Sequence, residues 1–158
     1  MKSLVIYYSR SGKTRDVAQR IAEGTSADVE EIVEVECHES YARSAIDAIL
    51  KRKPTLRPFG RSLDDYDLIF VGTPIWTMNA VPAIQSFLAT QEWMSRNVAL
   101  FCTMGGMGDK KAFHTMRSLA PGARIIGELG LDSQAFKDEE ALQERVTSWI
   151  EKVQSSAA

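Results

Sequence analysis

Cysteine, histidine and long apolar runs are scarce in this chain of 158 residues, and each shortage excludes a class of protein. The two cysteines, Cys37 and Cys102, lie far apart and form no CxxC motif, which argues against a disulfide framework and a zinc site. The two histidines, His38 and His114, have no metal-ligand spacing. We therefore expect reduced thiols and no bound metal.

No apolar run approaches the roughly 20 residues that a membrane-spanning helix needs, and the stretch in MKSLVIYYSRSG is too short for a signal peptide. We therefore expect a cytoplasmic protein without a transmembrane segment. Charge is nearly balanced, with 19 Lys and Arg against 21 Asp and Glu and a net charge of −2, so no basic field favours nucleic acid as a partner. The length predicts a single domain over residues 1–158.

Apolar runs alternate along the chain with stretches of helical periodicity. Strands are predicted at Leu4–Tyr8, Val29–Val35, Leu68–Gly72, Val98–Cys102 and Arg124–Leu131. Helices are predicted around Val17, Ala18, Ile21 and Ala22; Ala45, Ile46 and Ile49; Ala83, Ile84, Phe87 and Leu88; Phe113, Met116, Leu119 and Ala120; and Leu142, Val146, Trp149, Ile150 and Val153. This alternation of five strands and five helices predicts a parallel sheet with helices on both faces.

The character of each strand predicts its place in the sheet. The first, third and fourth strands are apolar throughout, as strands buried on both faces are, whereas VEEIVEVE and ARIIGELGLD contain charge or glycine. The second and fifth strands therefore belong at the edges. We predict an α/β fold, a three-layer doubly wound sandwich around a five-stranded parallel sheet in the order 2-1-3-4-5.

The stretch YSRSGKT, from Tyr8 to Thr14, follows the first strand and resembles the end of an ATP-binding P-loop. A P-loop reads GxxxxGK[ST], but the position of its first glycine is occupied by Tyr7. A short hydroxyl-rich turn at a helix N-terminus is instead suited to a single phosphate, with Ser9, Ser11 and Thr14 as donors and Gly12 allowing close approach. The alternative is that Ser9 or Ser11 only caps the helix.

Two further loops follow neighbouring strands, in GTPIWTMNAVP and CTMGGMGD. In a doubly wound sheet, ligands bind beyond the carboxyl ends of the strands at the switch point, here between the first and third strands. Three loops meeting there would suit a planar aromatic ligand with a phosphorylated tail. The alternatives are a Trp76 that only packs, glycines that only form a turn, and Met104 and Met107 as fillers of the core.

With these three loops, the chain resembles the flavodoxin-like FMN-binding proteins over nearly its whole length. Ser9–Thr14 resembles the [ST]-x-[ST]-G-x-T phosphate loop, and Thr73-Pro74-Ile75-Trp76 and Thr103–Gly108 resemble the two loops that flank the flavin. The resemblance implies FMN as cofactor and no catalytic side chain, because the flavin performs the redox chemistry. The implied cofactor-binding residues are Ser9, Arg10, Ser11, Gly12, Lys13 and Thr14 at the phosphate; Thr73, Pro74, Ile75, Trp76, Thr77, Met78 and Asn79, with Trp76 stacked on the ring; and Thr103, Met104, Gly105, Gly106 and Gly108 at its pyrimidine edge.

The resemblance implies a redox protein that transfers electrons through non-covalently bound FMN, acting with a redox partner protein. Two alternatives stay open: an FMN-dependent NAD(P)H oxidoreductase of the quinone-reductase type that serves a small electron acceptor, and a flavin-free binding module. A receiver-type signalling domain shares the strand order but needs acidic residues where this chain has Tyr8-Ser9 and Thr73. The basic stretch Lys51 to Arg61 is either a solvated loop or a docking patch, and the oligomeric state is open.

Overall fold

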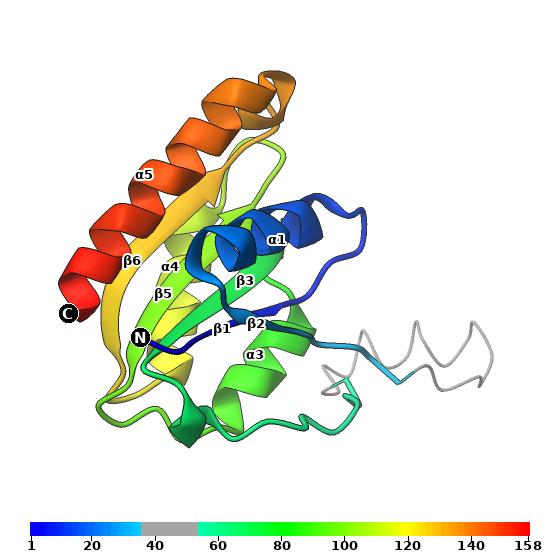
Figure 1. Ribbon diagram of the computed structural model, residues 1–158. Helices are drawn as coiled ribbons and strands as arrows, with labels where there is room; N and C mark the ends of the chain where they lie inside the picture. The colour runs from blue at the N-terminus through cyan, green and yellow to red at the C-terminus, as the bar shows by residue number, and fades with distance from the viewer. Residues whose placement is uncertain (36–53) are drawn as a thin grey trace, which may run out of the picture.

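A computed structural model describes residues 1–35 and 54–158 of the chain. A central sheet separates two helical layers, with α1 (Lys13–Thr25) and α5 (Glu139–Ala157) on one face and α3 (Pro82–Ala89) and α4 (Asp109–Leu119) on the other (Figure 1). The predicted helix around Ala45, Ile46 and Ile49 lies outside the described residues, as do Cys37, His38 and Lys51 to Lys53. Within the described ranges, no helix is long and apolar enough to cross a membrane.

The five parallel strands follow the order β2-β1-β3-β5-β6, which confirms the predicted order 2-1-3-4-5. The sequence missed one short antiparallel strand, β4, which pairs with the end of β3. The strands are β1 (Ser3–Tyr7), β2 (Asp28–Glu31), β3 (Leu68–Trp76), β4 (Asn79–Ala80), β5 (Asn97–Thr103) and β6 (Arg124–Leu131); two single helical turns, η1 (Leu63–Asp65) and η2 (Ala135–Lys137), complete the elements.

The central strands are apolar over most of their length because each of their faces packs on a different helical layer. Along β1, Leu4 and Ile6 belong to the core beneath α3 and α4, whereas Val5 and Tyr7 belong to the core beneath α1 and α5. Strand β3 alternates in the same way. This alternation is the packing expected for a parallel strand buried on both faces.

Two predicted strand ends differ from the structure by more than one residue. Strand β3 was predicted to end at Gly72 but continues to Trp76, because Thr73 and Pro74 still pair with β5 and the last residues pair with β4. Strand β2 ends at Glu31, four residues before the predicted end, and Glu34 forms only an isolated bridge with Leu56. The segment after Gly72, which was predicted to be a loop, therefore largely forms the end of β3 and its hairpin with β4.

Part of the basic connection before β3 returns to the carboxyl edge of the sheet. The Arg57 N–H donates to the Val33 carbonyl at 2.9 Å, beyond the carboxyl end of β2. From there the chain reaches Arg61, which pairs with Glu30 at 2.9 Å and with Asp28 at 3.3 Å. Arg61 thus fastens this connection to the edge strand, and that ion pairing is a structural role.

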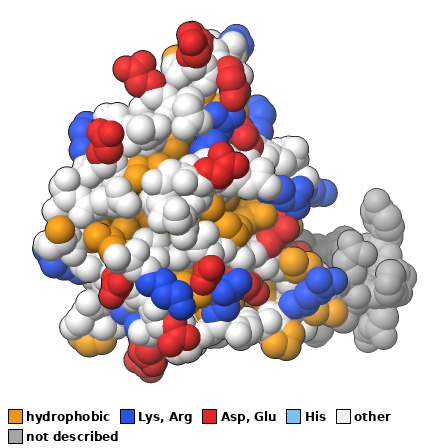
Figure 2. Space-filling view, in the orientation of Figure 1, with side chains coloured by type: hydrophobic (Ala, Val, Ile, Leu, Met, Phe, Trp, Pro, Cys, Tyr) orange, Lys and Arg blue, Asp and Glu red, His pale blue; other side chains and the backbone are white. Residues whose placement is uncertain are grey.

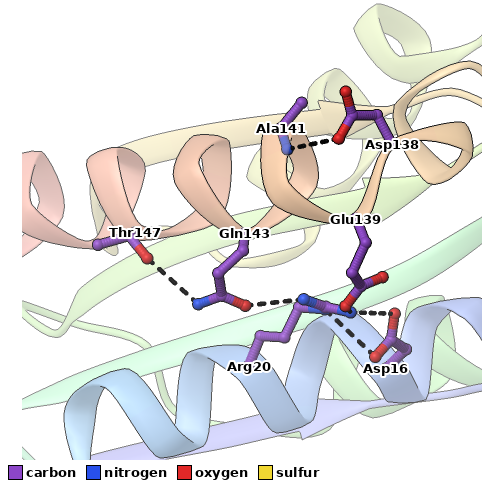
Figure 3. Close-up of polar contacts among 7 residues, drawn as sticks. All are labelled: Asp16, Arg20, Asp138, Glu139, Ala141, Gln143 and Thr147. Carbon is purple, nitrogen blue, oxygen red and sulfur yellow. Dashed lines mark hydrogen bonds and ion pairs between the residues drawn. The ribbon is translucent and has the colours of Figure 1, made fainter.

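Arg20 joins the two helices of one layer. It is mostly buried, with 13% of its side chain exposed, and donates to both carboxylate oxygens of Asp16 at 3.2 and 3.3 Å. Its guanidinium also reaches α5, where it donates to the Gln143 side chain at 2.7 Å and pairs with Glu139 (Figure 3). One arginine therefore satisfies acceptors on both helices. Elsewhere on this side of the molecule, acidic and basic side chains are interspersed (Figure 2).

We expect Arg20→Met to lower the free energy of unfolding by about 1 kcal/mol, because Met keeps the apolar stem but leaves the α5 acceptors without their donor. Arg124→Met is the matched control, since among the described residues the side chain of exposed Arg124 donates only to the Ser156 carbonyl, at 3.5 Å. Urea unfolding curves would give both values. Equal loss in the two variants would mean that the Arg20 contacts contribute nothing specific.

Candidate functional site

The turn after β1 leads directly into α1 and leaves the first donors of that helix unpaired. Gly12 is the N-cap residue, with φ 97° in the left-handed region, and no side chain caps the helix within the described part of the chain. The Ser9 hydroxyl accepts from the Gly12 N–H at 3.2 Å, outside the helix proper. The reading of Ser9 or Ser11 as a simple helix cap therefore finds no support here, and the first-turn N–H groups stay available to a ligand.

Open space lies over the backbone of two of the three loops. A Cβ atom built on Gly12, Gly105 or Gly106 would meet no heavy atom within 4 Å. Both segments follow parallel strands at the carboxyl edge of the sheet, β1 for the first and β5 for the second. The phosphate-loop turn and the glycine loop thus line accessible volume, which fits a group that approaches the backbone closely.

A buried hydrogen bond joins the phosphate loop to the end of β5. The hydroxyls of Thr14 and Thr103 lie 2.8 Å apart, and the two residues are 1% and 4% exposed. Thr14 belongs to the first turn of α1, and Thr103 is the last residue of β5 before the glycine loop. The first and third loops therefore have a fixed spacing.

Trp76 connects the phosphate loop to the hairpin that ends β3. The Arg10 guanidinium lies over the Trp76 ring, 5.1 Å from its centroid, and the Tyr8 ring meets it edge-on at 5.7 Å. Trp76 is half-buried, so part of it packs on the core while part stays accessible. Packing and ligand contact are compatible roles for this residue.

The hairpin also contacts the start of α4, closing the ring of three loops. A Cβ atom on Gly108 would lie 2.7 Å from Ile75 Cγ2 and 3.1 Å from Met78 Cα, and Gly108 has φ 113°. Only glycine fits both the left-handed conformation and this close approach. Gly108 thus serves the contact between hairpin and helix.

The predicted site residues lie together at this edge, but their side chains differ in availability. Thr73 is fully buried; its hydroxyl accepts from the Val81 N–H at 3.1 Å and donates to the Pro74 carbonyl at 2.8 Å, which stabilises the hairpin. Met107 is exposed, so it is not a filler of the core, whereas Met104 is half-buried; Met78 is exposed on the hairpin. Arg10, Ser11 and Lys13 are exposed at the phosphate loop.

Sequence reasoning missed two residues that shape the site. Tyr8 packs against Trp76, as described above, and the Ser133 hydroxyl donates to the Gly105 carbonyl at 2.8 Å, anchoring the glycine loop. Ser133 follows the carboxyl end of β6. The strand-end rule that found the other loops would have found it, had it been applied to the fifth predicted strand as well.

Two ionisable groups near this edge have pKa values that are raised by burial. Burial raises the pKa of Glu34, and the nearby Arg10 charge opposes that increase. Burial, reinforced by Asp109, raises the pKa of the Cys102 thiol to about 12, so this thiol stays protonated and unreactive at neutral pH. No group of three metal-ligating side chains occurs in residues 1–35 and 54–158.

The hairpin turn itself is strained. Thr77 and Met78 have φ 48° and 64°, so both central residues of this two-residue turn are left-handed. Such turns favour Asn-Gly, whereas a left-handed β-branched residue is unusual.

We expect the double substitution Thr77→Asn, Met78→Gly to raise the free energy of unfolding by about 1 kcal/mol by relieving this strain. Met94→Gly is the control: Met94 is also exposed but has no positive φ, so glycine there should lower stability. Thermal or urea unfolding would decide. A loss of stability in the double variant would contradict the assigned turn geometry.

A hollow of about 250 Å³ lies between α3 and the connection that precedes β3. Its walls include Ile32, Leu56, Phe59 and Phe87, and none of its lining residues belongs to the three loops. It is therefore separate from the candidate site.

Comparison with known proteins places these features in a family context. The flavodoxin family model matches residues 2–153. A flavoprotein from Lactobacillus acidophilus, solved in complex with FMN, is 26% identical, with 86% of this chain and 97% of that chain covered and a TM-score of 0.70. A flavoprotein from Bacteroides uniformis is 27% identical, with 95% and 97% covered and a TM-score of 0.77.

A more distant solved structure supports the fold alone. A flavodoxin from the domain Archaea is 18% identical, with all of both chains covered and a TM-score of 0.61. No curated protein matches the chain.

Proposed function

The chain belongs to the flavodoxin family, and on that premise we propose that it is a redox protein that binds FMN non-covalently and transfers electrons through it. One observation carries the proposal. Three loops at the carboxyl edge contact one another directly, through Thr14 and Thr103, Arg10 and Trp76, and Gly108 and Ile75. They surround the switch point between β1 and β3, where doubly wound sheets bind ligands.

The turn from Ser9 to Thr14 would hold the phosphate. The unpaired N–H groups at the start of α1 are donors, the helix dipole favours an anion, and Gly12 lets the phosphate approach the backbone. Arg10 and Lys13 add positive charge beside it. These residues fit a dianionic phosphate because the unpaired N–H donors, the helix dipole and the two positive charges all favour an anion.

Trp76 and the loop from Thr103 to Gly108 would hold the ring system. The half-buried Trp76 would offer its aromatic ring for stacking, and the open backbone at Gly105 and Gly106 would offer peptide groups to the polar edge of the flavin. Ser133 keeps that backbone in place through the Gly105 carbonyl. When bound, FMN supplies the redox chemistry, while these residues bind it and orient it.

The proposal is tested by adding FMN to the purified protein, removing the excess by gel filtration and recording the visible spectrum. We expect about one oxidised flavin to be retained per chain, and to be reduced by dithionite and reoxidised by air. A chain that retains no flavin would overturn the proposal and leave a flavin-free binding module.

Anaerobic mixing of the loaded protein with NADPH or NADH then separates a carrier from a reductase. Bleaching of the flavin within seconds would identify a nicotinamide-dependent oxidoreductase that serves a small electron acceptor. Absence of bleaching, with fast reduction through a flavoprotein reductase, would identify an electron carrier that works with a redox partner protein.

A further inference from the structure

The buried hydroxyl pair formed by Thr14 and Thr103 has two protons, and the described residues provide an acceptor for only one of them. At 2.8 Å the two oxygens share one hydrogen bond, in which either can be the donor. Within the described residues, neither hydroxyl has a second hydrogen-bond partner. Each threonine brings one proton, so the pair leaves one hydroxyl proton without a protein acceptor. Leaving such a buried donor unpaired is unfavourable.

The surroundings decide which hydroxyl an added acceptor would meet. Thr14 is in the first turn of α1, beside N–H groups that have no intrahelical partner, whereas Thr103 is the last residue of β5. A phosphate at the helix N-terminus would therefore meet Thr14. Thr14 then donates to the phosphate, and Thr103 donates to Thr14, so both protons have acceptors.

We propose that Thr103 is a positioning residue for the phosphate, acting through Thr14, and that it helps the protein to select FMN over riboflavin. This inference rests on the proposed function. The family resemblance implies that the backbone of Thr103 to Gly108 meets the pyrimidine edge of the ring, and the inference adds a separate role for the Thr103 hydroxyl. The Thr103 hydroxyl is buried and hydrogen-bonded to Thr14, so it affects the binding of the phosphate through Thr14. In a chain of hydrogen bonds that ends on an anion, each hydrogen bond strengthens the binding of that anion.

The two roles predict different binding patterns for Thr103→Val, which has nearly the same shape but no hydroxyl. If Thr103 acts through the phosphate, FMN affinity falls about tenfold and riboflavin affinity stays within about twofold. If Thr103 acts on the ring, the two affinities fall together, which would overturn the proposal. Quenching of flavin fluorescence gives both dissociation constants, and Thr103→Ser should restore FMN affinity.

A double-mutant cycle tests whether Thr103 acts through Thr14. Thr14→Val should weaken FMN binding, and adding Thr103→Val to it should cause little further loss, because the relay is already broken. Fully additive losses would contradict the relay. Near-ultraviolet circular dichroism of each variant shows whether its fold is intact.

A measurement on the unmodified protein keeps the proposal testable even where a variant fails to fold. Inorganic phosphate alone should shift the methyl NMR signals of both Thr14 and Thr103. A Thr103 signal that responds to riboflavin but not to phosphate would overturn the proposal. Failure of the proposed function looks different, since the unmodified protein would then bind neither FMN nor riboflavin.

Discussion

Gly12→Asp is expected to lower FMN affinity about 1000-fold, the largest effect of any single substitution considered. The new carboxylate would stand where the phosphate approaches the backbone, and two like charges about 4 Å apart cost about 4 kcal/mol at an effective dielectric constant of about 20. The space in front of Gly12 is open, so the side chain itself meets no obstacle. Any residue other than glycine is strained at φ 97°, so the charge effect is given by the difference between Gly12→Asp and a neutral variant of the same shape.

Gly12→Asn is the matched control because it has the same shape without the charge. Asparagine tolerates the left-handed conformation at φ 97° better than most residues, so we expect a loss of about tenfold or less. Calorimetric titration of both variants with FMN and with riboflavin gives the comparison. Similar affinities for FMN in the Asp and Asn variants would place the phosphate elsewhere.

Trp76→Ala is expected to lower the affinities for FMN and riboflavin together, by about 30-fold, because it removes the stacking face for the ring. It also removes the ring that Arg10 and Tyr8 contact. This pattern differs from that expected at Thr103, where only the phosphorylated flavin should be affected.

Trp76→Phe should restore most of the affinity by keeping an aromatic ring. Trp93→Phe is a second control: Trp93 is buried away from the loops and donates to the Leu88 carbonyl at 2.7 Å, so its replacement should lower stability without selective loss of flavin. Unchanged flavin affinity in Trp76→Ala would mean that Trp76 only packs.

The strand order could be predicted because strands buried on both faces and strands at the edge of a sheet differ in their residue types. Strands buried on both faces, such as β1 with Leu4 to Tyr7, must be apolar at every position, and edge strands need not be. The order of the strands then determined which loops lie next to one another at the carboxyl edge of the sheet. The resemblance to the flavodoxin-like family was carried by those same loops and agrees with the family match over residues 2–153.

The contacts that join the loops could not be predicted. Nothing in the local sequence shows that Thr14 would meet Thr103, 89 positions away, because that contact depends on how α1 packs across the sheet. The extension of β3 to Trp76 was missed for a similar reason. Thr77-Met78 is not a typical hairpin turn sequence, and tertiary contacts with Gly108 overcome its local preference.

The most direct test of the central claim is an amide NMR titration of the protein with FMN. The account predicts saturation at about one equivalent, with the largest shifts confined to Ser9 to Thr14, Trp76 to Asn79 and Thr103 to Gly108. It would be contradicted by the absence of saturable shifts, or by shifts centred on the hollow lined by Ile32, Phe59 and Phe87.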